Sequence, residues 1–341
     1  MKQKTGTSPR MGRRRFLQIV AAAGATGALW QLGLRKKILQ GKVVRQSRVM
    51  MGTQINLIVY GPDSDTCEEA VHATFSRMEG LIGSLSRHSP ESELSELNRT
   101  GRLANPGNDL RQVLLFAEQI SKLTEGTFDV TVLPLLELYK NGHADNTLPT
   151  TEELHNTLQM VDYRKIAISP TAITLDKKGM AITLDGIGKG YIVDQGVATL
   201  KSRGFSSVYV EAGGDLMVTG AKKGDEPWRI GIRNPRPESS DKLIAIGITN
   251  RAVATSGDYM QPFTPDLRYH HIIDPRTGIS PPELASATVT APTVVLADGL
   301  ATAVMVLGPK KSKELLESIP GCEGLFISKN LSRTQTSGFI G

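Results

Sequence analysis

The chain is organised around Arg268-Tyr269-His270-His271-Ile272-Ile273-Asp274-Pro275-Arg276-Thr277-Gly278, followed by Ala297-Asp298-Gly299-Leu300-Ala301-Thr302-Ala303. The first stretch predicts a short apolar strand flanked by two histidines and an Asp-Pro turn. The second predicts a helix on which Asp298 and Thr302 stand at i and i+4, on one face. Two oxygens on one helix face suit a hard cation such as Mg²⁺, which takes few protein ligands and completes its shell with phosphate and water.

Composition argues against a nucleic-acid role for the body of the chain. Of 341 residues, 39% are apolar and 22% charged, which is ordinary for a protein with a full core. The net charge of +6 is uneven, because the first 48 residues hold 12 Lys or Arg and no Asp or Glu. Removing these 12 from the total of 40 leaves 28 basic and 34 acidic residues in 49–341, a net charge of −6. Nucleic-acid binding needs a basic footprint, and the net charge of this body is acidic.

The N-terminal residues 1–40 are predicted to be an export signal. The run from Gly12 to Gln18 resembles a twin-arginine motif, and the uncharged run from Ile19 to Gly33 is short for a membrane span, which needs about 20 residues. An N-terminal anchor in the inner membrane is the alternative. We expect a periplasmic protein with one domain over residues 41–328 and a frayed C-terminal tail over 329–341. Cys67 and Cys322 lack metal-site spacing and are expected to be free thiols, although a disulfide stays open.

Helices and strands are mixed along this domain. An apolar stripe at 3–4 spacing predicts a helix over 65–86, and Asp65 with Glu68 predicts its N-terminal cap. Similar patterns predict helices over 109–124, 294–307 and 312–318. Alternating patterns predict strands at 49–61, 164–185, 208–211, 216–219, 228–233, 243–249, 252–255, 286–291 and 324–327. The many hairpin-like neighbours favour an α+β fold with antiparallel sheets. A doubly wound parallel sheet is the second choice.

A Gly-rich turn follows the predicted strands at 164–185. It consists of Asp185-Gly186-Ile187-Gly188-Lys189-Gly190, and the following residues predict a helix, so free backbone N–H groups are offered to a phosphate. The spacing fits neither a P-loop nor the dinucleotide fingerprint. Lys189 could hold phosphate or pair with a carboxylate.

Seven short motifs in one order resemble the FAD:protein FMN transferase family (ApbE). They are Met51-Gly52-Thr53, Gly126-Thr127-Phe128-Asp129, Asp185 to Tyr191, Ala212-Gly213-Gly214-Asp215, Ser256-Gly257-Asp258-Tyr259, His271 to Gly278, and Ala297-Asp298 with Ala301-Thr302. The resemblance covers roughly residues 45–328. It implies a T-fold-like α+β architecture, with antiparallel sheets packed against helices. It also implies bound FAD and Mg²⁺, and transfer of FMN from FAD to a threonine of an acceptor flavoprotein, with release of AMP.

The resemblance also implies roles for individual residues. Asp298, Thr302 and the backbone carbonyl of Gly186 match the Mg²⁺ ligands, and His271 matches the histidine tied to transfer. The FAD contacts correspond to Met51, Thr127, Phe128, Asp129, Thr183, Lys189 and Ile272. Two positions depart from the family pattern: Thr183 stands where an Asp is expected, with Asp185 two residues later, and Tyr139 stands where a Trp is common.

The implied chemistry is attack of a threonine hydroxyl on the FMN-side phosphorus of FAD. The phosphate charge must be neutralised and the hydroxyl must lose a proton. We expect His271 to take that proton, since a histidine near its free pKa of about 6.5 is a competent base at neutral pH. Asp258 is the rival base. Two other functions stay open: a Mg²⁺-dependent hydrolase giving FMN and AMP, and a non-catalytic periplasmic flavin carrier.

Overall fold

The computed structural model describes residues 42–144, 147–222, 226–236 and 244–340. The predicted export signal lies outside these residues. The elements, in chain order, are β1 (Lys42–Met50), β2 (Thr53–Gly61), α2 (Ser64–Leu85), α3 (Glu93–Thr100), β3 (Arg102–Ala104), α4 (Asn108–Leu123), η2 (Val130–Val132), α5 (Leu133–Ala144), α6 (Thr151–Leu158), η3 (Tyr163–Lys165), β4 (Ile166–Ile168), β5 (Ala172–Leu175), α7 (Gly188–Ser202), β6 (Ser207–Ala212), β7 (Asp215–Thr219), β8 (Trp228–Ile232), β9 (Ile244–Ile248), β10 (Arg251–Gly257), β11 (Leu284–Ala291), α8 (Val294–Glu317), β12 (Glu323–Ser328) and β13 (Arg333–Gln335).

One large sheet dominates the fold. It has eight strands in the order β1-β2-β6-β7-β10-β11-β12-β13, and two small sheets have the orders β3-β5-β4 and β8-β9. Every pair of neighbouring strands in the described part of the chain is antiparallel. The predicted α+β class with antiparallel sheets is therefore confirmed, and the parallel alternative is wrong.

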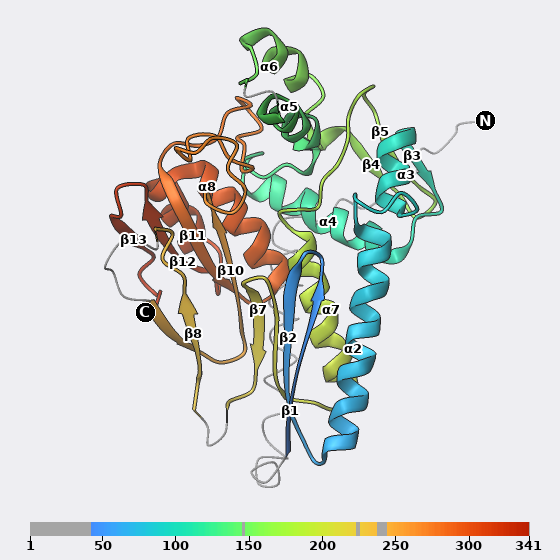
Figure 1. The fold of residues 1–341 in the computed structure, drawn as a ribbon, viewed down its shortest axis with the longest axis vertical. Helices are drawn as coiled ribbons and strands as arrows, with labels where there is room; N and C mark the ends of the chain where they lie inside the picture. Colours follow the sequence, from blue (N-terminus) through green and yellow to red (C-terminus); the bar gives the residue numbers. More distant parts are fainter. Residues whose placement is uncertain (1–41, 145–146, 223–225, 237–243, 341) are drawn as a thin grey trace, which may run out of the picture.

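The two faces of the large sheet have different covers. Every second side chain of a strand, such as Leu57 and Val59 on β2, points to one face of the sheet and packs there with the apolar stripes of α2, α7 and α8. Residues pointing the other way, such as Val218 and Val253, form a second core with Trp228 on β8. Helix α7 packs against both α2 and α8, and Figure 1 shows α2 and β8 on opposite sides of strands β2, β7 and β10. The period-2 pattern thus gives these strands two differently covered faces.

Some predicted boundaries need correction. The strand expected over 49–61 is a hairpin, because Met51 (φ 55°) and Gly52 (φ 69°) make a two-residue turn between Met50 and Thr53. The cap of α2 is Asp63, which accepts a hydrogen bond of 2.8 Å from the N–H of Thr66, so the capping role expected of Asp65 was wrong. The two helices expected at 294–307 and 312–318 are confirmed as the two parts of α8, which meet at a kink at the non-helical Gly308, whose φ is 74°.

Two segments differ more strongly from prediction. Residues 176–185 form no third strand after β4 and β5, since the Ile182 N–H and C=O bond to the side chain of Asn98 instead of a strand. The expectation of a frayed tail was also wrong, because β13 pairs with β12 at the edge of the large sheet.

Cys67 and Cys322 are free and buried, as expected. None of the helices in the described part of the chain has the length and apolarity to cross a membrane.

Candidate active site

Helices α7 and α8 approach closely where the Gly-rich turn ends. A Cβ atom on Gly190 would lie 2.6 Å from the carbonyl oxygen of Val294 and 2.9 Å from Cβ of Asp298, so only glycine fits. In return, the N–H of Gly190 donates a hydrogen bond of 3.0 Å to Oδ2 of Asp298. The first turn of α7 therefore holds the carboxylate of Asp298 directly.

The three predicted metal ligands come together at this contact. A Cβ atom on Gly186 would lie 3.0 Å from Oγ1 of Thr302, which is itself 3.4 Å from Oγ of Ser256 at the end of β10. Asp298 stands one turn earlier on α8 and is only 3% exposed. Among its oxygens, only Oδ2 accepts a hydrogen bond from the described residues. A carboxylate, a hydroxyl and a backbone carbonyl are the oxygen donors that Mg²⁺ prefers, so the residues fit the predicted ion.

Among the described residues, no group of three or more His, Cys, Asp or Glu side chains is gathered as a metal site. The expected ligand set contains only one such residue, Asp298, so this finding does not test it.

Lys189 lies among the carboxylates of this centre. Its ammonium pairs with Asp215 at the start of β7, and Oδ1 of Asp215 is 3.4 Å from the N–H of Thr255. Burial acts to lower the pKa of Lys189, but the charges of Asp215 and Asp298 outweigh it and raise the pKa above its ordinary value. Lys189 therefore stays charged. Of its two predicted roles, the structure shows the carboxylate pair.

The carboxyl of Asp298 is hard to ionise without a further cation. Burial and the nearby charge of Asp215 raise its pKa to about 7, although Lys189 and the Gly190 N–H favour the charged form. A bound divalent cation would favour the carboxylate strongly. This is the electrostatic setting in which a metal ligand is expected.

Asp194 fixes the start of α8. Its two carboxylate oxygens accept hydrogen bonds of 3.0 and 2.9 Å from the N–H groups of Val294 and Val295, while the cap residue Thr293 makes no side-chain cap bond. Burial raises the pKa of Asp194 to about 6. A residue of α7 thus fixes where the first turn of α8 lies relative to α7, and with it the positions of Asp298 and Thr302.

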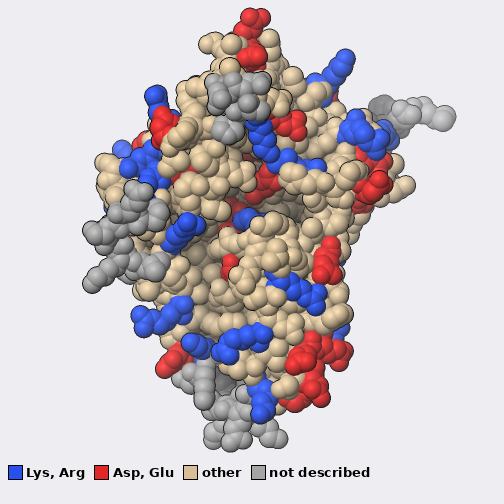
Figure 2. Space-filling view, viewed as in Figure 1, with Lys and Arg blue, Asp and Glu red and all other residues tan. Residues whose placement is uncertain are grey.

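Asp185 borders the same centre and pairs with Arg87. Nε and Nη2 of Arg87 lie 3.1 and 2.9 Å from Oδ2 of Asp185. Burial alone would raise the pKa of Asp185, but Arg87 outweighs it and the pKa is lowered. Figure 2 shows a hollow near the middle of the face seen in that view, with acidic and basic side chains at its floor.

His271 reaches this centre from the loop between β10 and β11. Its backbone N–H donates to the carbonyl of Gln261 at 3.0 Å, and its half-buried ring feels the charges of Asp185 and Lys189, as Asp298 does. Burial lowers the pKa of His271 below its ordinary value. The ring is therefore neutral at pH 7, and Nδ1 is buried without a hydrogen-bond partner among the described residues. A neutral imidazole can accept a proton.

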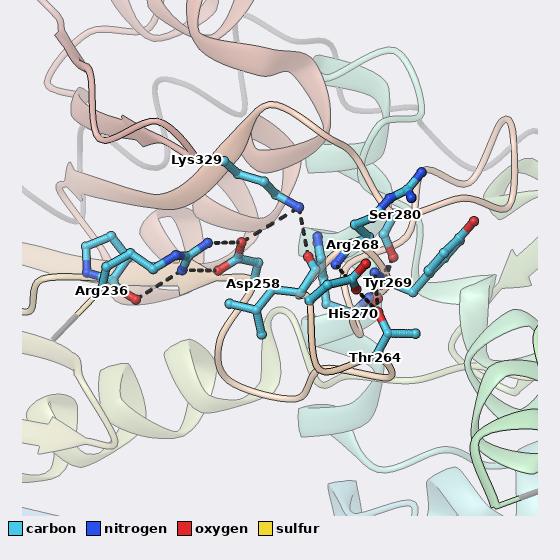
Figure 3. Close-up of polar contacts among 11 residues, drawn as sticks. Arg236, Asp258, Thr264, Arg268, Tyr269, His270, Ser280 and Lys329 are labelled. Carbon is cyan, nitrogen blue, oxygen red and sulfur yellow. Dashed lines mark hydrogen bonds and ion pairs between the residues drawn. The ribbon is translucent and has the colours of Figure 1, made fainter. Parts of the chain in front are cut away.

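Asp258, the rival base, sits in a different environment. It is completely buried, and its two oxygens accept hydrogen bonds of 2.9 and 2.7 Å from the guanidinium of Arg236. The ammonium of Lys329 lies 3.8 Å from the same carboxylate, as Figure 3 shows. Asp258 therefore lies in a buried cluster of ion pairs, and its carboxylate is not exposed.

The neighbouring His270 lies inside the protein. Its ring is fully buried, and neither ring nitrogen has a hydrogen-bond partner among the described residues. Burial, together with the charge of Lys329, lowers the pKa of His270 to about 3. The ring is neutral at any ordinary pH.

The predicted FAD residues divide into two groups. Phe128 lies beside the metal ligands, since its Cε2 would be 3.4 Å from a Cβ on Gly186, and Ile272 is buried next to His271. Met51 stands at the tip of the β1–β2 turn, with its φ of 55°.

The others carry local hydrogen bonds. Thr127 donates to the carbonyl of Thr124, Thr183 accepts from the N–H of Asp185, and both oxygens of Asp129 are used by Thr131 and Tyr163. Their role toward FAD stays a prediction.

Three residues of this region were not identified from the sequence. Asp215 belonged to a quoted motif, but its pairing with Lys189 carried no local signal. Arg236 follows β8 of the two-stranded sheet and Lys329 follows β12 of the large sheet, so they meet Asp258 only in the folded chain.

Comparisons with known proteins agree with this geometry. The model of the ApbE family matches residues 51–326. An FAD:protein FMN transferase of Haemophilus influenzae is 33% identical over 290 residues, covering 81% of this chain and 84% of the relative. One from Treponema pallidum is 29% identical over 348 residues, covering 91% and 94%. The crystal structure of the Pseudomonas stutzeri flavinyl transferase ApbE, in its apo form, superposes with a TM-score of 0.78 at 28% identity, covering 88% and 96%. The chain therefore belongs to the ApbE family.

Proposed function

We propose that this protein transfers FMN from FAD to a threonine hydroxyl of an acceptor flavoprotein, with Mg²⁺ and with release of AMP. The observation that carries the proposal is the meeting of Gly186, Asp298 and Thr302, with the ring of His271 within electrostatic reach of Asp185 and Lys189 of the same centre. Relatives of similar length bear the name of this transferase activity.

Asp298, Thr302 and the carbonyl of Gly186 would hold the ion. When bound, Mg²⁺ neutralises charge on the diphosphate and lowers the barrier to attack at phosphorus. The fixed hydrogen bond from Gly190 keeps one oxygen of Asp298 in place, which leaves the other for the ion. Lys189 stays charged at the same centre and supplies a further positive group toward phosphate oxygens.

His271 is the proposed general base. The threonine oxygen forms a bond to the FMN-side phosphorus, its proton passes to the imidazole, and the bond from that phosphorus to the AMP oxygen breaks. Asp258 suits this role poorly, because both its oxygens bond to Arg236 and it has no exposed surface.

The test is an incubation of the purified protein with FAD, Mg²⁺ and a candidate acceptor, compared with the same acceptor carrying Val at the target threonine. Flavin fluorescence on the acceptor in a denaturing gel, lost with EDTA and with the Val acceptor, is the expected result. Free FMN and AMP without labelled acceptor would favour the hydrolase. Bound FAD with neither product, for several acceptors, would favour the flavin carrier.

We also propose that the protein is exported to the periplasm by the twin-arginine route. The support is Arg13-Arg14 before an uncharged run, in a segment free of acidic residues. Membrane contact would then be limited to this segment while it stays uncleaved. Cell fractionation of the wild type and of a variant with both arginines changed to lysine tests this, and equal periplasmic amounts of the two would contradict it.

A further inference from the structure

The loop that carries His271 runs from Asp258 at the end of β10 to Glu283 before β11. Its first half folds back on itself, with the Phe263 N–H donating to the Tyr269 carbonyl at 2.8 Å and the His271 N–H donating to the Gln261 carbonyl. His271 thus lies at the base of an irregular hairpin whose tip is at 264–268. Whatever fixes this hairpin fixes the imidazole.

The tip of the hairpin is conformationally costly. Leu267 has a φ of 58°, in the left-handed region that residues with a Cβ rarely adopt. Such a conformation persists only where surrounding contacts enforce it. A contact to Leu267 from outside the loop is therefore expected.

Lys329 makes that contact, and it also holds both ends of the loop. Its ammonium donates to the carbonyl of Leu267 at 2.8 Å and lies 3.8 Å from the carboxylate of Asp258. Its backbone N–H donates to the carbonyl of Glu283 at 2.9 Å. One residue following β12 therefore touches the start, the tip and the end of the loop, and Figure 3 shows its side chain reaching over Asp258 toward the hairpin.

We propose that Lys329 is a positioning residue for the transfer reaction, which holds the hairpin so that His271 faces the centre formed by α7 and α8. It lies beyond residue 326, where the match to the family model ends. The proposal rests on the function proposed above for His271. Lys329 itself is not a catalytic residue here, because its ammonium is directed to Leu267 and Asp258.

The test compares the full-length protein with Lys329→Ala, Lys329→Arg and the control Lys313→Ala. Lys313 is a partly exposed lysine of α8 whose ammonium lies 4.0 Å from the carboxylate of Glu317. The first readout is kcat for FMN transfer and KM for FAD. The second is hydrogen–deuterium exchange over 259–283, with β2 as internal reference.

We expect Lys329→Ala to lower kcat about tenfold, with KM for FAD within about twofold of wild type, because the base is misplaced and substrate binding is not. Exchange over 259–283 should rise at least about fivefold, with no change in β2. Lys329→Arg should restore both, since a guanidinium can donate to the same two oxygens. Lys313→Ala should behave as wild type.

Two results would overturn the proposal. One is unchanged exchange and unchanged kcat in Lys329→Ala. The other is a rise in exchange that includes β2 and is not rescued by arginine, which would indicate a general loss of stability. If the wild type transfers no FMN to any acceptor, the proposed function fails, but the exchange experiment still decides whether Lys329 holds the loop.

Discussion

Two neighbouring regions of this protein both bury aspartate, and they differ in charge balance. We call them the helix centre (Asp185, Lys189, Asp215 and Asp298) and the loop cluster (Arg236, Asp258, His270 and Lys329). The helix centre has three carboxylates around one ammonium, and Arg87 pairs with Asp185 at its border. The loop cluster has two cations around one carboxylate. The helix centre is short of positive charge and suits a cation. In the loop cluster the single carboxylate is already paired with two cations.

The comparison teaches that burial alone does not identify a functional aspartate. Asp258 is more completely buried than Asp298, yet its oxygens are already satisfied. Asp298 receives one hydrogen bond, and its pKa is raised to about 7. A carboxylate with spare acceptor capacity and a perturbed pKa is the better candidate for chemistry.

The largest expected effect comes from emptying the helix centre. Asp298→Ala should lower the initial rate of FMN transfer by about 10²-fold or more at fixed Mg²⁺, because the ion loses its only side-chain carboxylate. Asp176→Ala, at an exposed position after β5, is the matched control and should transfer at the wild-type rate. Transfer by Asp298→Ala at more than a tenth of the wild-type rate would refute this role.

Breaking the loop cluster should act on stability first. Asp258→Ala leaves Arg236 and Lys329 without their shared carboxylate, and we expect a loss of about 3 kcal/mol in the free energy of unfolding. Urea denaturation measures this. Glu79→Ala, which removes an exposed pair with Arg48, should cost less than about 1 kcal/mol. Equal costs for the two variants would show that the loop cluster is not a closed ion pair.

The smallest expected effect concerns His270, whose pKa is lowered to about 3 by burial. The unfolded chain takes up a proton at His270 below about pH 6.5 while the folded protein does not, so stability is lost as pH falls from 6.5 toward 3. His270→Gln cannot titrate. The wild type should therefore lose up to about 1.4 kcal/mol per pH unit more than His270→Gln between pH 6 and 4.

Unfolding free energies measured at several pH values test this slope. His155→Gln, at an exposed position on α6, is the control and should keep the wild-type slope. Parallel curves for the wild type and His270→Gln would show that the folded protein accepts the proton at His270.

The helix centre was largely predictable from local sequence. Asp298 and Thr302 stand at i and i+4, as the pattern predicted. The Gly-rich turn before α7 was expected to offer N–H groups to a phosphate, and the N–H of Gly190 bonds to Asp298 instead. Most strands followed from alternation, because one face of the sheet packs on helices and the other on β8 and β9. Local sequence patterns were sufficient to predict residues that a single helix or strand positions.

The loop cluster was not predictable in this way. Asp258 and Lys329 follow β10 and β12 of the large sheet, whereas Arg236 follows β8 of the separate two-stranded sheet. The strand order and the packing of that small sheet on the large one together bring them to one place. The Met51-Gly52 turn was missed because apolar residues continue through it, and the left-handed Leu267 has no glycine to mark it. The tail was expected to fray, since the short strand β13 gains its partners only from β12.

The most direct test compares two variants side by side: His271→Ala and Asp258→Asn, assayed for initial rate of FMN transfer per folded molecule. Our account predicts that His271→Ala keeps wild-type stability and loses about 10²-fold in rate. It predicts that Asp258→Asn loses stability but stays within about tenfold of the wild-type rate. Full transfer by His271→Ala, with transfer abolished in folded Asp258→Asn, would contradict the account and exchange the roles of the two residues.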